Sequence, residues 1–306
     1  MNKEDEMMLN APQDATHFSR LDRIQTCLTQ QNYSELVDIC EQAIELEPED
    51  VSNYWYLGLA LLLQGNEADA QMAWMTPLLE AEPEQVEQWT ADLTQILDSE
   101  AQDQAAREQY EMAWLLRQHL REFIPEDLAN LLLVFELGLK ANTFSLEDEL
   151  LGQIVQGLQQ TEPSQVAIES EHFLQIITSL IGLGAEHPAV LDFLQACIPH
   201  IEQAEQTQPF VDMLLAQGMK DFQVSKGRSA INLGKIAVQL APNYLKALSY
   251  AIFFMQSGNA QSLLESIPLT KQRLAISDNI TDQISATHDI LTSLMLTCQS
   301  WQESLH

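Results

Sequence analysis

The chain has 306 residues, of which 46% are hydrophobic and 7% aromatic, and its formal net charge is −31. A chain of this length and apolar content can bury a sizeable core, which excludes a disordered tail. It contains only eleven glycines and eleven prolines, and the stretches between them are rich in Leu, Ala, Gln and Glu, which favour helix. We therefore predict an all-α protein.

The negative charge is concentrated in the first two thirds of the chain. Residues 1–205 carry 38 acidic and 7 basic side chains, whereas residues 206–306 carry 7 of each. An acidic surface repels phosphate backbones, so we predict no nucleic-acid partner for this part. The simplest interpretation of the charge is that acidic helix surfaces keep the protein in solution.

The N-terminal residues and the cysteines indicate where the protein is located. Residues 1–17 are acidic and have no apolar core of signal-peptide length, so we expect a flexible acidic N-terminus. No apolar run approaches the roughly 18 residues of a membrane helix. Cys27, Cys40, Cys197 and Cys298 form no CxxC pair and have no His at metal-ligand spacing. We expect a soluble cytoplasmic protein that has no membrane contact, no metal and no cofactor.

Residues 51–83 match the tetratricopeptide pattern W-x2-L-G-x2-Y, A-x3-F, P, which has a period of about 34 residues. The matching residues are Tyr54, Leu57, Gly58, Leu61, Ala70, Trp74 and Pro83. Gly58 and Ala70 are small because two antiparallel helices approach closely there, and Trp74 fills the layer around the contact. The pattern predicts a helical hairpin that turns at Gly65 and Asn66 and buries Trp74.

Two other stretches repeat this pattern. NYSELVDICEQAIELEP, residues 32–48, matches the second helix of a repeat, with Leu36 and Cys40 on the inner face and Ala43 at the close contact. SAINLGKIAVQLAPNYLKALSYAIFFMQSGN, residues 229–259, repeats the phrase AIELEP as AVQLAP and the phrase QGN as SGN. Both stretches are predicted to form hairpin helices of the same kind.

Between these copies the spacing of prolines continues the repeat. Prolines at positions 83, 125, 163, 199 and 242 fall 36 to 43 residues apart. One hairpin cannot bury its own apolar face, so neighbouring hairpins must stack. We predict a tetratricopeptide-like α-solenoid of about seven helical hairpins. Its expected divisions are tetratricopeptide hairpins at 18–98, degenerate hairpins at 99–205, and hairpins followed by a C-terminal helix at 206–306.

The stretches NYWYLGLALLLQGNEADAQMAW and ILTSLMLTCQSWQESL resemble the tetratricopeptide-containing N-terminal region of bacterial SPINDLY-type O-linked N-acetylglucosamine transferases and of related methyltransferase fusions. The catalytic region of such enzymes would add sheet-containing domains with Gly-rich loops, and none follows Leu305. Those transferases have a groove-lining Asn just before the Leu-Gly pair, where this chain has Tyr56. The resemblance implies a scaffold, or the detached recognition region of a split enzyme.

Candidate catalytic motifs do not fit their templates. GRSAINLGK, residues 227–235, has six residues between its first two glycines instead of four, and Ile236 follows its lysine. Glu169 and His172 have the ExxH spacing of di-iron bundles but no second such pair. The GxG of GLGAEHP, residues 182–188, lacks a third glycine, which indicates a helix end. We therefore predict no enzyme activity.

A basic patch interrupts the acidic sequence. Residues 206–264 contain the bases Lys220, Lys226, Arg228, Lys235 and Lys246 and only two acids, Asp212 and Asp221. Lys226, Arg228 and Lys235 are candidates for an anion-binding or docking patch. The alternative, which we favour, is that such charges pair with acidic helices of neighbouring hairpins.

The leading functional hypothesis is an interaction scaffold that holds a peptide or partner protein in a concave groove. The helix containing YWYLGLALLL has no polar face, so it must be covered on more than one side. Two sides of this helix are expected to be covered by residues 67–81 and by residues 36–44. The groove is then expected to present Ser52, Trp55, Tyr56, Leu59 and Leu63. A partner is favoured over a later segment of the chain as their cover, and self-association is possible.

Overall fold

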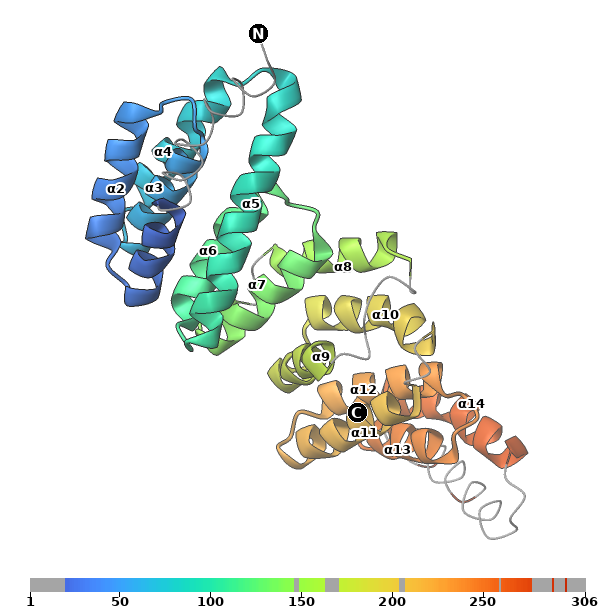
Figure 1. Ribbon diagram of the computed structural model, residues 1–306. Helices are drawn as coiled ribbons and strands as arrows, with labels where there is room; N and C mark the ends of the chain where they lie inside the picture. The colour runs from blue at the N-terminus through green and yellow to red at the C-terminus, as the bar shows by residue number, and fades with distance from the viewer. Residues whose placement is uncertain are drawn as a thin grey trace, which may run out of the picture. The chain divides into compact units, whose positions relative to one another are not determined.

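We describe a computed structural model of the protein. It describes residues 20–145, 149–162, 171–203, 207–258 and 260–276, together with residues 288 and 295. All regular secondary structure in these ranges is helical, which confirms the predicted all-α class (Figure 1). The predictions for the N-terminal residues 1–17 and for Cys298 lie outside the described residues.

The described helices follow one another along the chain. The first helix occupies residues 20–30 in its described part. It is followed by α2 (Tyr33–Leu46), α3 (Ser52–Leu63), α4 (Glu67–Glu80), α5 (Pro83–Ala106), α6 (Tyr110–Phe123), α7 (Leu128–Lys140), α8 (Leu150–Gln160), α9 (Glu171–Leu183), α10 (Pro188–Gln203), α11 (Thr207–Gln223), α12 (Gly227–Leu240), α13 (Leu245–Gln256) and α14 (Ala260–Ile276). Taken in pairs within these ranges, the helices make seven hairpins, as the sequence predicted.

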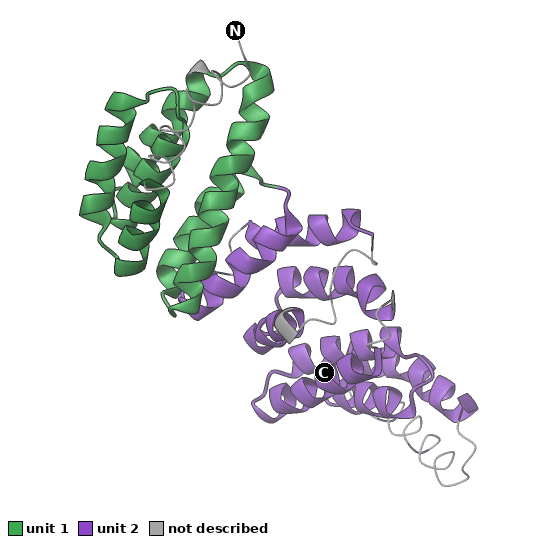
Figure 2. Ribbon diagram, in the orientation of Figure 1, with its two compact units in different colours: residues 1–125 green, residues 126–306 purple. Residues whose placement is uncertain are grey.

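The chain divides into two compact units, unit 1 at residues 1–125 and unit 2 at residues 126–306 (Figure 2). The sequence analysis instead placed divisions at 98/99 and 205/206. Helix α5 runs without a break through residues 98 and 99. Pro199, which was used as a repeat boundary, lies inside α10, so that boundary is wrong. A proline removes one helical hydrogen bond, but here the helix continues past it.

One backbone geometry recurs in the turns within five hairpins. A residue with positive φ ends the first helix at Gln31 (56°), Gly65 (85°), Glu108 (61°), Asn142 (57°) and Ser225 (65°). In each turn the next N–H donates to the carbonyl five residues earlier, at 2.8 to 2.9 Å. This is the Schellman arrangement, which favours glycine. Only Gly65 is a glycine. The other four hairpins therefore have the same turn without the glycine that would reveal it in the sequence.

The core of unit 1 forms around α3, which packs against α2, α4 and α5. Helices α3 and α4 pack tightly at Gly58, where an added Cβ would lie 2.2 Å from Trp74 Nε1. Trp74 is 1% exposed, and its Nε1 donates to the carbonyl of Trp55 at 3.2 Å. The predicted burial of Trp74 within its hairpin is therefore confirmed.

A buried polar network joins two hairpins of unit 2. The Ser229 hydroxyl of α12 donates to Asp221 Oδ2 of α11 and accepts the backbone N–H of Ala185, which lies between α9 and α10. The Asn232 side chain donates to the carbonyl of Ala185 at 2.8 Å. Asp221 and Ser229 are buried, so these hydrogen bonds compensate for the removal of the polar groups from water.

Gly58→Ala is expected to lower the thermal stability of the protein. In an open helix the same change raises stability by about 0.5 to 1 kcal/mol, but here the new methyl group overlaps the Trp74 ring. We expect a loss of about 1 to 3 kcal/mol, typical of overpacking. The matched control is Gly152→Ala in α8, where nothing lies within 4 Å of the added carbon.

Thermal unfolding of both variants, followed by circular dichroism, checks this prediction. The Gly152 variant should melt at or above the temperature of the parent protein, and the Gly58 variant below it. If the Gly58 variant also melts higher, Trp74 does not pack as described.

Candidate functional site

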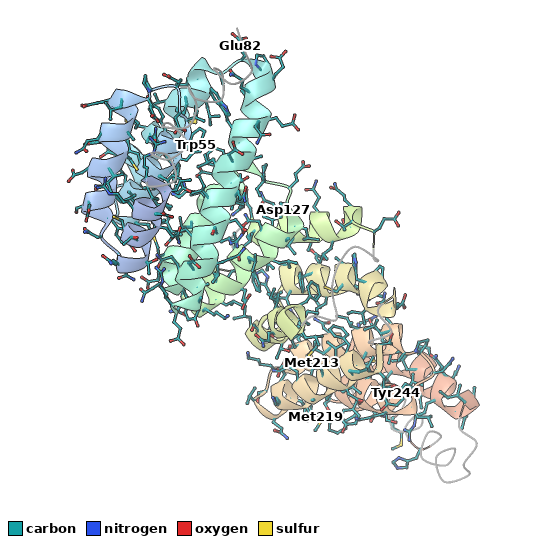
Figure 3. All side chains as sticks on the ribbon, in the orientation of Figure 1. Trp55, Glu82, Asp127, Met213, Met219 and Tyr244 are labelled. Atoms are coloured by element: carbon teal, nitrogen blue, oxygen red, sulfur yellow. The ribbon has the colours of Figure 1, made fainter. Side chains whose placement is uncertain are left out.

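Three of the five residues predicted to face a partner are buried by the protein itself. Trp55 and Leu59 are 0% exposed and Leu63 is 7% exposed. They belong to one core cluster with Leu93 and Leu97 of α5. The expectation that a partner covers Trp55 and Leu63 is therefore wrong, because α5 covers this side of α3. Figure 3 shows Trp55 in the interior of unit 1.

Ser52 has a local structural contact instead of a place in the groove. Its hydroxyl donates to Asp50 Oδ1 at 2.6 Å, and its backbone N–H donates to the same oxygen at 3.2 Å. These hydrogen bonds fix the turn that leads into α3. Ser52 is not among the residues that line the groove described next.

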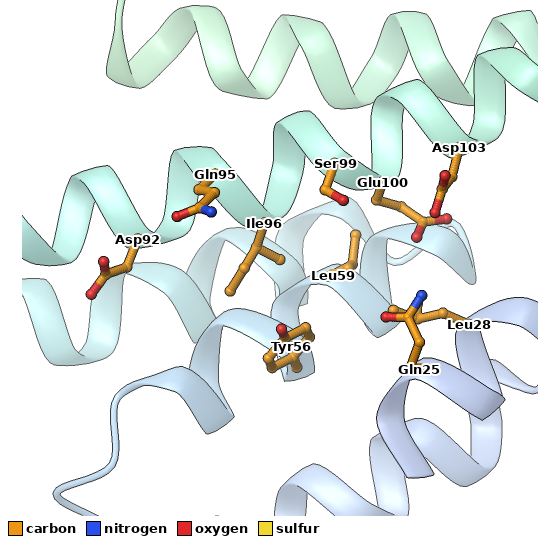
Figure 4. Close-up of a pocket in the computed structure, with 10 residues that line it drawn as sticks. All are labelled: Gln25, Leu28, Tyr56, Leu59, Asp92, Gln95, Ile96, Ser99, Glu100 and Asp103. Atoms are coloured by element: carbon orange, nitrogen blue, oxygen red, sulfur yellow. The ribbon is translucent and has the colours of Figure 1, made fainter. Parts of the chain in front are cut away.

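Tyr56 and Leu59 do line a groove, which has a volume of about 310 Å³ and lies within unit 1. Its walls come from the helix at residues 20–30, from α3 and from α5, the first helices of three successive hairpins (Figure 4). The lining residues are Gln25, Leu28, Tyr56, Leu59, Asp92, Gln95, Ile96, Ser99, Glu100 and Asp103. Leu59 contributes to the buried floor, and Tyr56 is half-buried.

Helix α5 supplies most of the groove wall. Its six lining residues follow at spacings of three, four, seven, eight and eleven from the first, which places them on one face of the helix. The helix begins with a capping box, in which Glu82 and Gln85 exchange side-chain to backbone hydrogen bonds, and Pro83 occupies the first turn. These start signals and 24 residues of unbroken helix carry the polar face of α5 across α3.

The charged side chains in the groove wall are all acidic. Of the ten lining residues, three are carboxylates and none is basic. Residues 20–125 as a whole carry 21 acidic and five basic side chains. Two of these bases are paired elsewhere: Arg20 contacts Glu47 at 2.8 Å, and Arg117 contacts Asp98 at 2.5 Å. The groove therefore has a strongly negative electrostatic potential.

Glu100 is the buried carboxylate of the groove, with 3% of its surface exposed. Its Oε1 accepts a hydrogen bond from Gln104 at 2.6 Å and lies 4.0 Å from Nη1 of Arg107. In the described part of the chain, no hydrogen-bond donor contacts the other oxygen, Oε2. Burial raises the pKa of Glu100 and Asp103 raises it further, against opposing effects of Gln104 and Arg107. A buried ionisable group in a cleft is a candidate functional group.

The predicted basic patch of unit 2 is partly neutralised by ion pairs. Lys235 of α12 contacts Glu265 of α14 at 2.6 Å, and Lys246 of α13 contacts Asp212 of α11 at 2.6 Å. Hydrogen bonding to Lys246 lowers the pKa of Asp212. Both pairs join neighbouring hairpins, as the favoured alternative expected for these charges.

Lys226 and Arg228 make no ion pair with any residue that the structure describes. Lys226 is the N-cap of α12, and the exposed Arg228 lies in its first turn. Residues 227–235, which include the Gly-Lys pair, form the start of α12. They are therefore helical and do not form a phosphate-binding loop. An anion-binding role for Lys226 and Arg228 remains a prediction.

The other candidate motifs add no second site within the described ranges. No group of three or more His, Cys, Asp or Glu that could bind a metal is present there, and Glu169 lies outside them. None of the described helices is long and apolar enough to span a membrane. Cys27, Cys40 and Cys197 are free and buried, and burial raises the pKa of Cys40 to about 12.

Comparison with known proteins gives only distant likenesses. No known protein family matches the sequence, and no curated protein matches it. The crystal structure of yeast Tom70 aligns at 11% identity and a TM-score of 0.28, covering 87% of this chain and 59% of that chain. The tetratricopeptide domain of P58(IPK) aligns at 13% identity and a TM-score of 0.25, covering 93% and 89%. Likenesses this distant carry no argument about function, and nothing here supports a relation to the glycosyltransferases.

Glu100→Gln is expected to stabilise the protein near neutral pH. Because burial raises the pKa of Glu100, the folded state binds its proton more tightly than the unfolded state does. Stability is therefore lost as the pH rises from the ordinary carboxyl pKa to the raised one. Glutamine keeps the hydrogen bond from Gln104 without the charge, so its advantage should be largest at about pH 7.5 and shrink towards pH 5.

Urea unfolding at several pH values measures this effect, with Glu87→Gln as the control. Glu87 is exposed on α5 outside the groove lining, and its replacement removes the same charge. An equal, pH-dependent gain in both variants would show that the effect comes from net charge and not from the burial of Glu100.

Proposed function

We propose that the protein is a non-catalytic interaction scaffold that holds an extended segment of a partner protein in the groove of unit 1. The observation that carries this proposal is the groove itself, which lies between the first helices of three successive hairpins. In stacked helical hairpins, such curved surfaces serve as extended binding faces.

The lining of the groove supports peptide binding. Tyr56 and Ile96, which are partly exposed, offer apolar contact area, and an aromatic ring loses little conformational entropy on binding. Gln25 and Gln95 carry amide groups that can both donate and accept hydrogen bonds from an extended main chain. With six polar and four apolar lining residues, the groove is more polar than a typical small-molecule pocket, which suits hydrogen bonding to an extended peptide.

The remaining partner assignments belong to the same proposal. The acidic surface of residues 20–125 disfavours nucleic acid, since it would repel a phosphate backbone. The free, buried thiols of Cys27, Cys40 and Cys197 fit a reducing compartment, which supports a cytoplasmic location. A second copy of the chain is an alternative occupant that the test below distinguishes.

Ser99→Arg is expected to block the groove without unfolding the protein. Ser99 is an exposed lining residue of α5, so a long side chain there can occupy the groove. The matched control is Ala91→Arg, which adds the same side chain at an exposed position of α5 outside the lining.

The test selects peptides from a displayed random library on the full chain and measures their affinity by fluorescence anisotropy. We expect Ser99→Arg to weaken binding about tenfold or more and Ala91→Arg to leave it unchanged. Peptides that bind both variants equally would show that the groove is not the working surface. Sedimentation of the free protein detects self-association, which Ser99→Arg would abolish if a second copy were the occupant.

A further inference from the structure

The chemistry of the groove narrows the kind of segment that can occupy it. Asp92, Glu100 and Asp103 lie along one face of α5 and point into the groove, as Figure 4 shows. Glu100 and Asp103 lie next to each other near the end formed by Gln25 and Leu28. The three negative charges are therefore spread along the groove wall.

Among the residues that the structure describes, no base makes a hydrogen-bonding contact with any of these three carboxylates. Glu100 forms a long ion pair with Arg107, whose Nη1 lies 4.0 Å from Oε1, beyond hydrogen-bonding distance. Glu100 is almost fully buried, and its Oε2 has no donor among the described residues. Glu100 is thus buried with one amide hydrogen bond and one long ion pair, both at Oε1, so a cation bound at Oε2 would offset part of the cost of burying its charge.

The side of the groove opposite the carboxylates carries apolar side chains next to the polar Gln25. Tyr56 and Leu59 of α3 face Ile96 of α5, and Leu28 closes the end near Glu100 (Figure 4). Lys and Arg side chains have an apolar stem and a charged end, so they bury the stem along apolar surface. An aromatic ring such as that of Tyr56 also attracts a cation. A wall of this kind beside carboxylates matches the two parts of such a side chain.

We propose that the groove of unit 1 binds a cationic segment of a partner protein, with a Lys or Arg side chain lying on Tyr56 and Ile96 and its charged end at Glu100 and Asp103. This inference rests on the proposed function of the groove. An acidic segment would be repelled by the three carboxylates. A wholly apolar segment would cover the carboxylate of Asp103 and the Oε2 of Glu100 without giving either a new polar partner, which is unfavourable.

If Glu100 serves binding, its replacement should affect the affinity for the partner and the stability of the protein in different ways. If a residue only supports the fold, its replacement lowers the stability of the protein. In contrast, a buried charge kept for binding lowers the stability of the unoccupied protein, so its neutral replacement retains or raises stability and loses affinity. The variant Glu100→Gln therefore distinguishes the two roles.

The experiment uses the full chain and a fluorescein-labelled nine-residue peptide of alternating Lys and Ala, with matched peptides in which Glu or Ser replaces Lys. Fluorescence anisotropy should show binding of the Lys peptide only. The double variant Glu100→Gln, Asp103→Asn should bind it about tenfold more weakly, while Glu87→Gln should stay within about twofold of the parent protein. Asp103→Asn alone, at a partly exposed position, decides the question if the double variant fails to fold.

Two results would overturn the inference. The first is equal binding of the Glu or Ser peptide. The second is an equal loss of affinity in Glu87→Gln, which would show a general attraction by the net charge.

Comparing Ser99→Arg with the carboxylate variants shows whether this inference fails alone or together with the proposed function. If library peptides are blocked by Ser99→Arg but are insensitive to the carboxylate variants, the groove binds a segment that is not cationic. If Ser99→Arg blocks nothing, the proposed function fails as well.

Discussion

The structure of unit 1 depends on covering α3, a helix with no polar face. Its hairpin partner α4 approaches so closely at Gly58 that the Trp74 ring occupies the space of a side chain. Helix α2 covers a second side, and α5 packs on a third, where Leu93 and Leu97 join the cluster around Trp55. Because each contact removes apolar surface from water, the burial of α3 fixes the positions of the helices around it.

The same arrangement creates the groove. Helix α5 packs one face on α3 and turns an adjacent face, which carries carboxylates, towards the helix at residues 20–30. Glu100 lies where these two faces meet, so it is buried and yet lines the groove. Burial raises its pKa, which opposes folding near neutral pH. A charge held at a cost to stability is typical of functional sites.

The two units use charged and polar side chains differently. In unit 2, Lys235 and Lys246 pair with acids on helices of neighbouring hairpins. Ser229 likewise links the side chain of Asp221 to the backbone of Ala185. These groups therefore hold hairpins together. Unit 1 also has ion pairs, between Arg20 and Glu47 and between Arg117 and Asp98, but in addition three of its carboxylates line an open groove whose lining has no basic side chain.

The sequence by itself determined the all-α class and the hairpin at residues 51–83, including the burial of Trp74. These features follow from local spacing, since small and large residues of one hairpin meet at fixed intervals. The tertiary structure decided the division after residue 125 and the turns at Gln31 and Glu108, which lack the glycine that would reveal them. It also decided which residues line the groove. A helix such as α3 that is apolar all round does not indicate which side its neighbours will cover, and only the path of α5 across it settles that point.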